Sequence, residues 1–138
     1  MKKLIVFSGA GMSAESGLKT FRDNDGLWEN YKVEEVATPQ AWKENPELVL
    51  HFYNLRRRQL SQVEPNSAHY LISELENKFD VTVITQNIDD LHERAGSENV
   101  LHLHGELKKV RSEKHYNLIY DWQYKDIQLG DLCEKGTQ

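Results

Sequence analysis

The chain has 138 residues, of which 38% are hydrophobic and 28% are charged, a balance typical of a soluble globular domain or a piece of one. Its net charge of −5 argues against nucleic acid as a partner, because phosphate binding needs a basic surface. No stretch approaches the ~20 apolar residues of a membrane span. The N-terminal apolar run is too short for a signal peptide. The single cysteine, Cys133, excludes an internal disulfide and fits a reducing cytoplasm.

The first predicted strand covers residues 3–8 and ends abruptly at glycines. The continuous apolar run Leu4-Ile5-Val6-Phe7 is typical of a strand that is buried in a parallel sheet. Residues 9–14, Gly-Ala-Gly-Met-Ser-Ala, fit the G-x-G-x-x-G/A form of the dinucleotide-binding turn, where glycines let the backbone approach a pyrophosphate. The glycines alone are equally compatible with a plain turn between a strand and a helix.

A polar loop follows this turn. A second turn at Ser16-Gly17 comes too early for a long helix, and Asp23-Asn24-Asp25-Gly26 is a loop signature. The loop carries Phe21 and Arg22, and we expect it to form a flap over a ligand. In that flap Arg22 is suited to a phosphate or ribose and Phe21 to a ring.

Helices and strands alternate along most of the remaining chain. The predicted elements are, in order, a helix that Thr38 caps and Pro39 begins, a longer helix over residues 46–62, a helix capped by Asn66 or Ser67, a strand over 79–85, a short helix over 88–95 ended by Gly96, and a strand over 100–103. This alternation predicts an α/β fold in which helices cover both faces of a parallel sheet. From Glu106 onward the sequence shows no clear period.

Polar side chains follow the strand predicted at residues 79–85. Ligands of open parallel sheets bind beyond the carboxyl ends of the strands. Gln86 and Asn87 can donate and accept hydrogen bonds, and Asp89 only accepts, which suits an amide and a ribose better than a phosphate. Asn and Asp before a helix are also ordinary cap residues, and that alternative stays open.

Two histidines, His102 and His104, stand two positions apart at the end of a predicted strand, so they would point the same way. This spacing suggests a metal site, but we find no cysteine pair or carboxylate close in sequence to complete it. The alternative is a pair of hydrogen-bonded strand-end histidines. An imidazole also suits a general base, because its ordinary pKa lies near neutrality.

Tyr53 and Arg56 are three positions apart on the predicted long helix and so emerge on one face. Arginine offers a planar fork for a carboxylate, and tyrosine adds a hydroxyl. The alternative is that Arg56-Arg57-Arg58 forms a solvated basic face.

Three of these stretches together resemble the sirtuins, the NAD-dependent protein-lysine deacylases. Residues 9–17 followed by Phe21-Arg22 resemble the first sirtuin signature, although Lys19-Thr20 stands where many members have Pro-Asp. Residues 85–96 resemble the second signature, and residues 103–106 resemble the His-Gly motif. The resemblance implies the N-terminal part of a Rossmann-like, doubly wound parallel sheet over residues 1–105, followed by the start of a small subdomain over 106–138.

The resemblance also implies site residues and a reaction. The expected contacts to NAD, the co-substrate, are Gly9, Ala10, Gly11, Met12, Ser13, Glu15, Ser16, Gly17, Thr20, Phe21, Arg22, Trp28, Gln86, Asn87, Ile88 and Asp89. The acyl-lysine oxygen would attack the nicotinamide ribose, and His104 would act as the base, while His102 has no role in the motif. Nicotinamide, O-acyl-ADP-ribose and free lysine would be the products.

The same resemblance suggests which acyl groups are removed. Tyr53 and Arg56 match the Tyr-x-x-Arg pair of sirtuins that act on acidic acyl chains. This match marks succinyl- and malonyl-lysine as substrates besides acetyl-lysine. The expected partners are therefore acylated proteins in the cytoplasm.

Two absences distinguish this chain within the family. Sirtuins commonly carry two Cys-x-x-Cys pairs for zinc, but here Ser112 follows Arg111 and Cys133 stands alone, so we expect no zinc. The chain also covers only about the first half of the family domain. We therefore expect a polypeptide of these residues alone to expose Leu4 to Phe7 as a bare sheet edge and to be poorly folded, self-associated or inactive.

Two other functions remain as alternatives. One is a fragment that binds nucleotide without catalysis. The other is a Rossmann oxidoreductase, which would carry an acidic residue at a strand end about 20 residues after the glycines. Glu34 and Glu35 stand near that distance but follow a loop.

Overall fold

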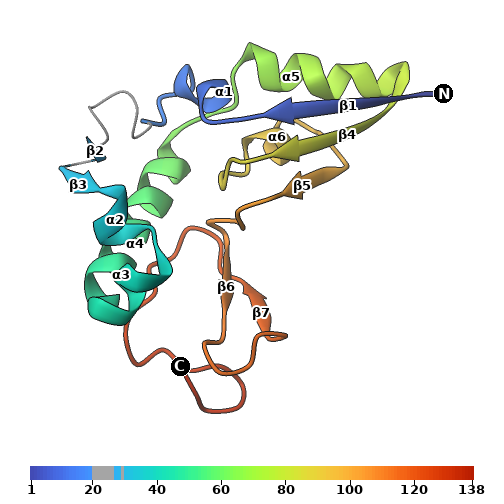
Figure 1. Ribbon diagram of the computed structural model, residues 1–138. Coiled ribbons are helices and arrows are strands. Elements are labelled where there is room, and N and C mark those ends of the chain that lie inside the picture. Colours follow the sequence, from blue (N-terminus) through green and yellow to red (C-terminus); the bar gives the residue numbers. More distant parts are fainter. Residues whose placement is uncertain (20–26, 29) are drawn as a thin grey trace. The chain divides into compact units, whose positions relative to one another are not determined.

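The computed structural model describes residues 1–19, 27–28 and 30–138, with residues 27–28 described by their backbone only (Figure 1). The chain divides into two compact units that each combine two stretches of sequence. The first unit comprises residues 1–18 and 62–106, and the second comprises residues 19–61 and 107–138. The division into domains 1–105 and 106–138 stays a prediction.

The first unit is built on a parallel sheet of β1 (Lys2–Ser8), β4 (Phe79–Thr85) and β5 (Val100–His102) in the order β1-β4-β5 (Figure 1). The parallel α/β fold expected from the sequence is confirmed. β1 and β4 pair along their whole length from Lys2–Phe79 to Ser8–Thr85, so that both strands end at the same edge. The polar segments that follow them are thereby brought together.

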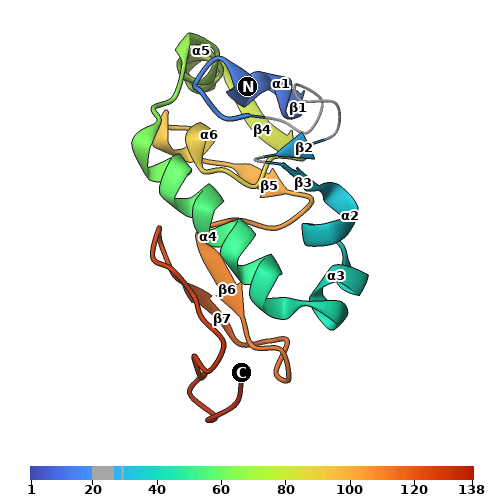
Figure 2. The same ribbon diagram turned by 90° about the vertical axis from the view of Figure 1, so that its left-hand side faces the viewer.

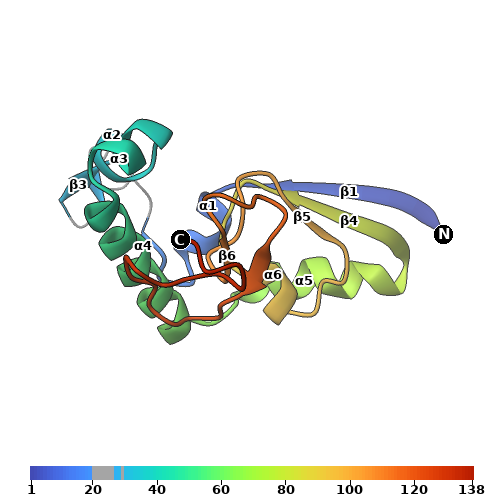
Figure 3. The same ribbon diagram turned by 90° about the horizontal axis from the view of Figure 1, so that it is seen from below.

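Helices of this unit cover one face of the sheet. α5 (Ser67–Glu74) and α6 (Leu91–Arg94) lie on the same side (Figure 3), and the strand residues Val81, Val83 and Thr85 are buried. On the opposite face Ile5, Phe7 and Leu101 are 66%, 63% and 53% exposed within the described residues. The expected self-association of a 138-residue polypeptide stays a prediction.

The ends of these helices follow from local side chains. Asn66 caps α5, because its side-chain oxygen accepts the Ala68 N–H at 3.0 Å. A 3₁₀ turn (Leu75–Asn77) continues that helix toward β4. Gly96 ends α6 as expected, with a φ of +107°. α6 begins three residues later than the predicted 88, since the polar side chains of residues 87–89 bond to other segments.

The second unit is organised on a long helix, α4 (Pro46–Gln62), which Figure 2 shows along its length. The expected cap of α3 (Pro39–Glu44) is present, since the Thr38 hydroxyl accepts the Ala41 N–H at 3.0 Å. The remaining elements are short and were not predicted: α2 (Val33–Val36), the antiparallel pair β2 (Leu27–Trp28) and β3 (Tyr31–Lys32), and the antiparallel pair β6 (Lys109–Arg111) and β7 (Ile119–Asp121).

Polar side chains of α4 hold the C-terminal segment of the second unit. The buried Arg57 donates from Nε to the Leu107 carbonyl at 2.7 Å. Asn54 donates to the Ile127 carbonyl at 2.8 Å and accepts the Ile127 N–H at 2.9 Å. In this unit side chains thus supply hydrogen-bond partners for backbone groups, a task that strand pairing performs in the first unit.

Among the residues that the structure describes, no helix is both long and apolar enough to cross a membrane.

Candidate functional site

The first part of the candidate site is the turn after β1. Gly9 and Ala10 leave the strand and α1 (Gly11–Ala14) begins at once, with hydrogen bonds from the Met12 N–H to the Gly9 carbonyl at 3.0 Å and from the Ser13 N–H to the Ala10 carbonyl at 3.2 Å. Ser13 is buried, whereas the neighbouring Gly11 is exposed. The short helix is followed by Gly17, whose φ of +102° favours glycine.

Asn66 fixes this turn from the start of α5. Its Nδ2 donates to the Met12 carbonyl at 2.8 Å and to the Ser16 hydroxyl at 3.0 Å. The cap residue predicted for one helix therefore also positions the glycine-rich turn. Sequence reasoning missed this second role, because the partners lie 54 and 50 positions away along the chain.

The second part of the candidate site is the loop after β4. Asn87 is buried, and its Nδ2 donates to the Gly9 carbonyl at 3.0 Å and lies 3.3 Å from the Ser13 hydroxyl. The buried Asp89 accepts the Ser13 O–H at 2.8 Å and the Leu91 N–H at 3.1 Å. Asp89 therefore bonds to the first residue of α6, whose N-cap is Asp90, and like Asn87 it also reaches across to the first turn. The two predicted segments meet in one hydrogen-bonded junction.

Buried hydroxyls support this junction at the ends of β1 and β4. The Ser8 hydroxyl donates to the Thr85 oxygen at 2.8 Å, and that oxygen accepts the Asn87 N–H at 3.0 Å. The His92 Nε2 lies 2.9 Å from the Ser8 oxygen, and its ring meets the His69 ring edge-on with centroids 5.0 Å apart. Burial lowers the pKa of both histidines, so that each is neutral at neutral pH.

The third part is the segment after β5. His104 is exposed, and the following Gly105 turns the chain with a φ of +84°. The role of His104 as the base stays a prediction.

His102, to which the sequence assigned no role, contacts three segments of the first unit. Its Nδ1 lies 2.7 Å from the Asn87 carbonyl, and its Nε2 lies 2.5 Å from Glu93 and 3.8 Å from Glu106. The expectation that no carboxylate stands close to this histidine is therefore wrong. Glu106 follows it by four positions, a spacing that was visible in the sequence, whereas the α6 residue Glu93 is brought in by the fold.

The chemistry of the junction fits a nucleotide with an amide-bearing ring. A Cβ built on Gly11 would meet nothing within 4 Å, whereas one on Gly9 would come within 3.4 Å of the Gln86 side-chain oxygen. The turn is thus open beside Gly11, where a phosphate could approach the backbone. The amide of Asn87 and the carboxylate of Asp89 supply partners for a carboxamide and a ribose.

Other predicted contacts to NAD lie around this junction or outside the described residues. Glu15 and Gln86 are exposed and Ile88 is half-buried. Thr20, Phe21 and Arg22 fall among the residues that the structure does not describe, and of Trp28 only the backbone is described.

The three arginines of α4 have three different environments. Arg57 is buried and bonds to the Leu107 carbonyl and the Asn54 side chain, whereas Arg58 pairs with Asp126 on the surface. Arg56 lies over the Phe52 ring, 5.6 Å from its centroid, and its charge lowers the pKa of Tyr53 against the larger raising effect of burial. The arginines therefore do not form a uniform solvated face, and Arg56 lies near Tyr53 as the helical spacing predicts.

Cys133 lies in a group of hydrogen-bonded residues at the C-terminal end of the second unit. Hydrogen bonds from Thr137 and Ser112 lower the pKa of its thiol to about 6. Ser112 is buried, accepts the His115 N–H at 3.2 Å and donates to the Gln138 carbonyl at 3.1 Å. Protein groups thus bond to one another around Ser112 and Cys133, and the absence of zinc stays a prediction.

Taken together, the first unit has the form of a nucleotide-binding α/β sheet whose polar junction lies at the carboxyl ends of parallel strands. The family model that matches this chain is that of the Sir2 family, over residues 9–136. The chain belongs to the Sir2 family, the sirtuins.

Similar proteins agree with this assignment. A Helicobacter pylori protein named NAD-dependent protein deacylase is 62% identical over 138 residues, which are 100% of this chain and 60% of that protein. A Bacteroides thetaiotaomicron protein of the same name is 55% identical over 143 residues, covering 100% of this chain and 61% of the relative. The chain thus spans about three fifths of the length of these relatives.

Solved structures show the same fold. A Sir2 homologue mutant in complex with ADP-ribose is 44% identical with a TM-score of 0.87, over 99% of this chain and 55% of that one. A Sir2 homologue in complex with NAD is 45% identical with a TM-score of 0.85, over 99% of this chain and 54% of that one.

Proposed function

We propose that this protein removes acyl groups from protein lysines with NAD as co-substrate, and that nicotinamide and O-acyl-ADP-ribose are released. The observation that carries the proposal is the junction in which Ser13, Asn87 and Asp89 join the glycine-rich turn to the loop after β4. Two observations support it: relatives are named NAD-dependent protein deacylase, and similar structures hold NAD or ADP-ribose.

Each part of the junction has a proposed task. The backbone of residues 9–14 binds the phosphates, and the side chains of Asn87 and Asp89 bind the nicotinamide ribose and carboxamide. His104 acts as the general base on the ribose side, a role that suits an exposed imidazole at the sheet edge. The flap residues Thr20, Phe21, Arg22 and Trp28 are included among the NAD contacts on the basis of the sequence alone.

Tyr53 and Arg56 are proposed to select acidic acyl chains. Arg56 keeps its guanidinium over the Phe52 ring, and Phe52 and Tyr53 meet edge-on with centroids 5.1 Å apart. This stacking restricts the side chains before a ligand binds, which lowers the entropic cost of recognising a carboxylate. Succinyl- and malonyl-lysine are the proposed substrates besides acetyl-lysine, in cytoplasmic proteins and without zinc.

The proposal is tested by incubating the protein with NAD and acyl-lysine peptides and following nicotinamide and O-acyl-ADP-ribose by mass spectrometry. We expect nicotinamide release that depends on the acyl peptide and is lost in Asn87→Ala. The exposed Asn77→Ala, which removes the same side chain from the 3₁₀ turn, is the matched control and should retain activity.

Three outcomes separate the alternatives. NAD binding without peptide-dependent turnover would favour a nucleotide-binding protein without catalysis. Reduction of NAD by an organic substrate would favour an oxidoreductase. Equal activity of Asn87→Ala and Asn77→Ala would remove the junction from the site.

A further inference from the structure

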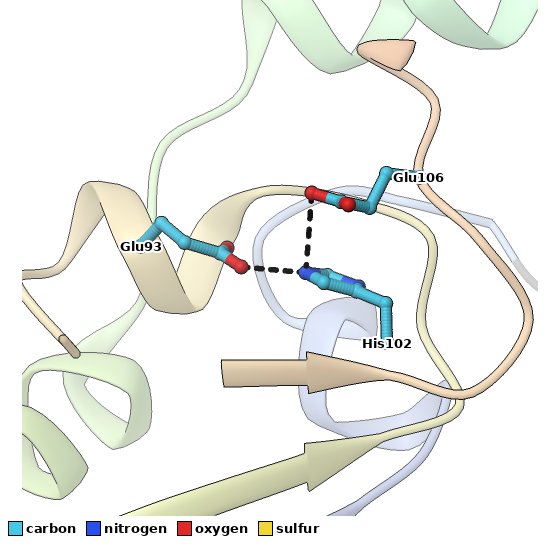
Figure 4. A group of neighbouring side chains, drawn as sticks. All are labelled: Glu93, His102 and Glu106. Carbon is cyan, nitrogen blue, oxygen red and sulfur yellow. Dashed lines mark hydrogen bonds and ion pairs between the residues drawn. The ribbon is translucent and has the colours of Figure 1, made fainter. Parts of the chain in front are cut away.

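His102 joins three segments of the first unit, and Figure 4 shows its contacts with two of them, through Glu93 and Glu106. Its side chain is only 6% exposed and ends β5, two residues before His104. One ring nitrogen faces the loop after β4 through the Asn87 carbonyl at 2.7 Å. The other faces Glu93 of α6 at 2.5 Å and Glu106, beyond the His104-Gly105 turn, at 3.8 Å.

Hydrogen-bond chemistry determines the proton content of this ring. A backbone carbonyl oxygen only accepts, and an ionised carboxylate only accepts. With the Glu93 carboxylate ionised, the Nδ1 of His102 donates to the Asn87 carbonyl and its Nε2 donates to Glu93. Both ring nitrogens then carry protons, and the ring is an imidazolium.

We propose that the imidazolium of His102 is a positioning residue, which holds the Asn87 loop and the His104-Gly105 turn to α6 in the arrangement that catalysis requires. The inference rests on the deacylase function proposed above. It assigns to His102 no contact with substrate, since both of its nitrogens are already used within the protein.

A metal ion at the same place is disfavoured by the distances. Glu93, His102 and Glu106 offer ligand atoms within 4.8 Å of one another, a set that could hold an ion. Two ligands at about 2.0–2.2 Å from a tetrahedral metal stand roughly 3.3 Å apart. The observed 2.5 Å between His102 and Glu93 is too short for an intervening ion and suits a charge-assisted hydrogen bond.

The charges around the ring agree with this reading. Burial would lower the pKa of His102, but the hydrogen bonds to Glu93 and Asn87 and the charges of Glu93 and Glu106 outweigh it, so the pKa lies above its ordinary value of 6.5. The neighbouring His92 has a lowered pKa, chiefly through burial, and the His102 charge adds to that effect. Within the same unit the pKa of His102 is thus raised and that of His92 is lowered.

The contacts of Asn87 explain why this position matters. Its side chain bonds to the glycine-rich turn through the Gly9 carbonyl, while its own carbonyl bonds to His102. Loss of the imidazolium proton would leave a nitrogen lone pair against the Glu93 carboxylate, which is repulsive. The Asn87 loop and the segment that carries His104 would then lose their common anchor.

The test combines nuclear magnetic resonance of the His102 ring with the pH profile of deacylation. In the wild-type protein we expect both ring nitrogens to show the shifts of a protonated imidazole near neutral pH. Glu93→Gln is expected to lower the His102 pKa and to move the alkaline limb of kcat to lower pH. Glu98→Gln, which removes an equally exposed carboxylate outside the cluster, should change neither.

His102→Leu gives the size of the effect. A misplaced Asn87 loop is expected to lower kcat roughly 10- to 100-fold, while His102→Gln, which keeps one donor, recovers part of the loss. A kcat of His102→Leu that equals the wild-type value would overturn the positioning role.

Two further results would overturn the proposal. One is a His102 ring that is neutral in the wild-type protein at pH values below the ordinary histidine pKa of 6.5. The other is stoichiometric binding of Zn²⁺ that disappears in His102→Leu. Failure of the proposed function looks different. A protein without deacylase activity whose His102 ring is protonated and responds to Glu93→Gln would contradict the deacylase function and still show the His102–Glu93 contact.

Discussion

The two compact units use polar side chains in opposite ways. In the first unit, β1, β4 and β5 satisfy one another's backbone, and polar side chains gather where the strands end. In the second unit, the strands of β2, β3, β6 and β7 are two or three residues long, and buried polar side chains of α4 bond to backbone carbonyls instead.

This difference helps to separate functional from structural polar residues. Asn87 and Asp89 follow β4, which pairs with strands on both sides at its carboxyl end, and their side chains join two loops at that edge. Asn54 and Arg57 replace missing backbone partners and are committed to the fold. A buried polar residue is a better functional candidate where the backbone around it is already satisfied.

The largest effect on activity should come from His104, in the segment after β5 of the first unit. His104→Ala is expected to reduce deacylation by roughly 10²- to 10⁴-fold, the usual contribution of a general base. Because His104 is exposed, the melting temperature should stay close to that of the wild-type protein. Steady-state kinetics with calorimetry checks both expectations, and wild-type turnover would exclude His104 from the chemistry.

The second effect tests the structural role of polar residues in the second unit. Arg57→Ala removes charged hydrogen bonds to the Leu107 carbonyl and to Asn54, and should destabilise the protein by about 2–4 kcal/mol. Denaturant unfolding measures the loss. Arg58→Ala, which breaks only the exposed pair with Asp126, is the matched control and should change stability little. Equal losses in both variants would break the contrast between the units.

Arg56 lies in the second unit but is proposed to act on the substrate, so its replacement tests whether that unit also holds a functional polar residue. Arg56→Met is expected to lower desuccinylation roughly 10- to 100-fold relative to deacetylation, because a charge-assisted contact contributes ~1.5–3 kcal/mol. The ratio of kcat/KM for succinyl- and acetyl-peptides is the measurement. A uniform loss on both substrates would place Arg56 with Arg57, as a residue that stabilises the fold.

The smallest effect is a pH dependence of the first unit. Burial lowers the folded-state pKa of His69 and His92, so their contribution to stability is present above their ordinary value of 6.5 and is lost as the pH falls through the folded pKa. His102 has a raised pKa, and its contribution is present below 6.5 and is lost as the pH rises through the folded pKa.

Melting temperatures recorded between about pH 5 and pH 9 should therefore fall toward both ends. His92→Gln should flatten the acid side, whereas the exposed His51→Gln in the second unit should leave the profile unchanged. An acid side that persists in His92→Gln would assign the effect to other groups.

Long elements could be located from the sequence more accurately than short ones. The strand at 79–85 in the first unit and the helix at 46–62 in the second were located to the residue, because long apolar periods and proline or asparagine caps are local signals. The short strands β6 and β7 were missed, since three residues carry no usable alternation. Their pairing depends on contacts with neighbouring segments.

The sequence by itself determined where the main helices and strands lie, where the glycine-rich turn falls, and that Asn87, Asp89 and His104 follow strand ends. The tertiary structure alone decided which polar groups meet. Ser13 and Asp89 are 76 positions apart, Arg57 and Leu107 are 50 apart, and His102 and Glu93 are 9 apart on different elements. Periodicity and capping are written in neighbouring residues, whereas a hydrogen-bond partner depends on where the chain returns in space.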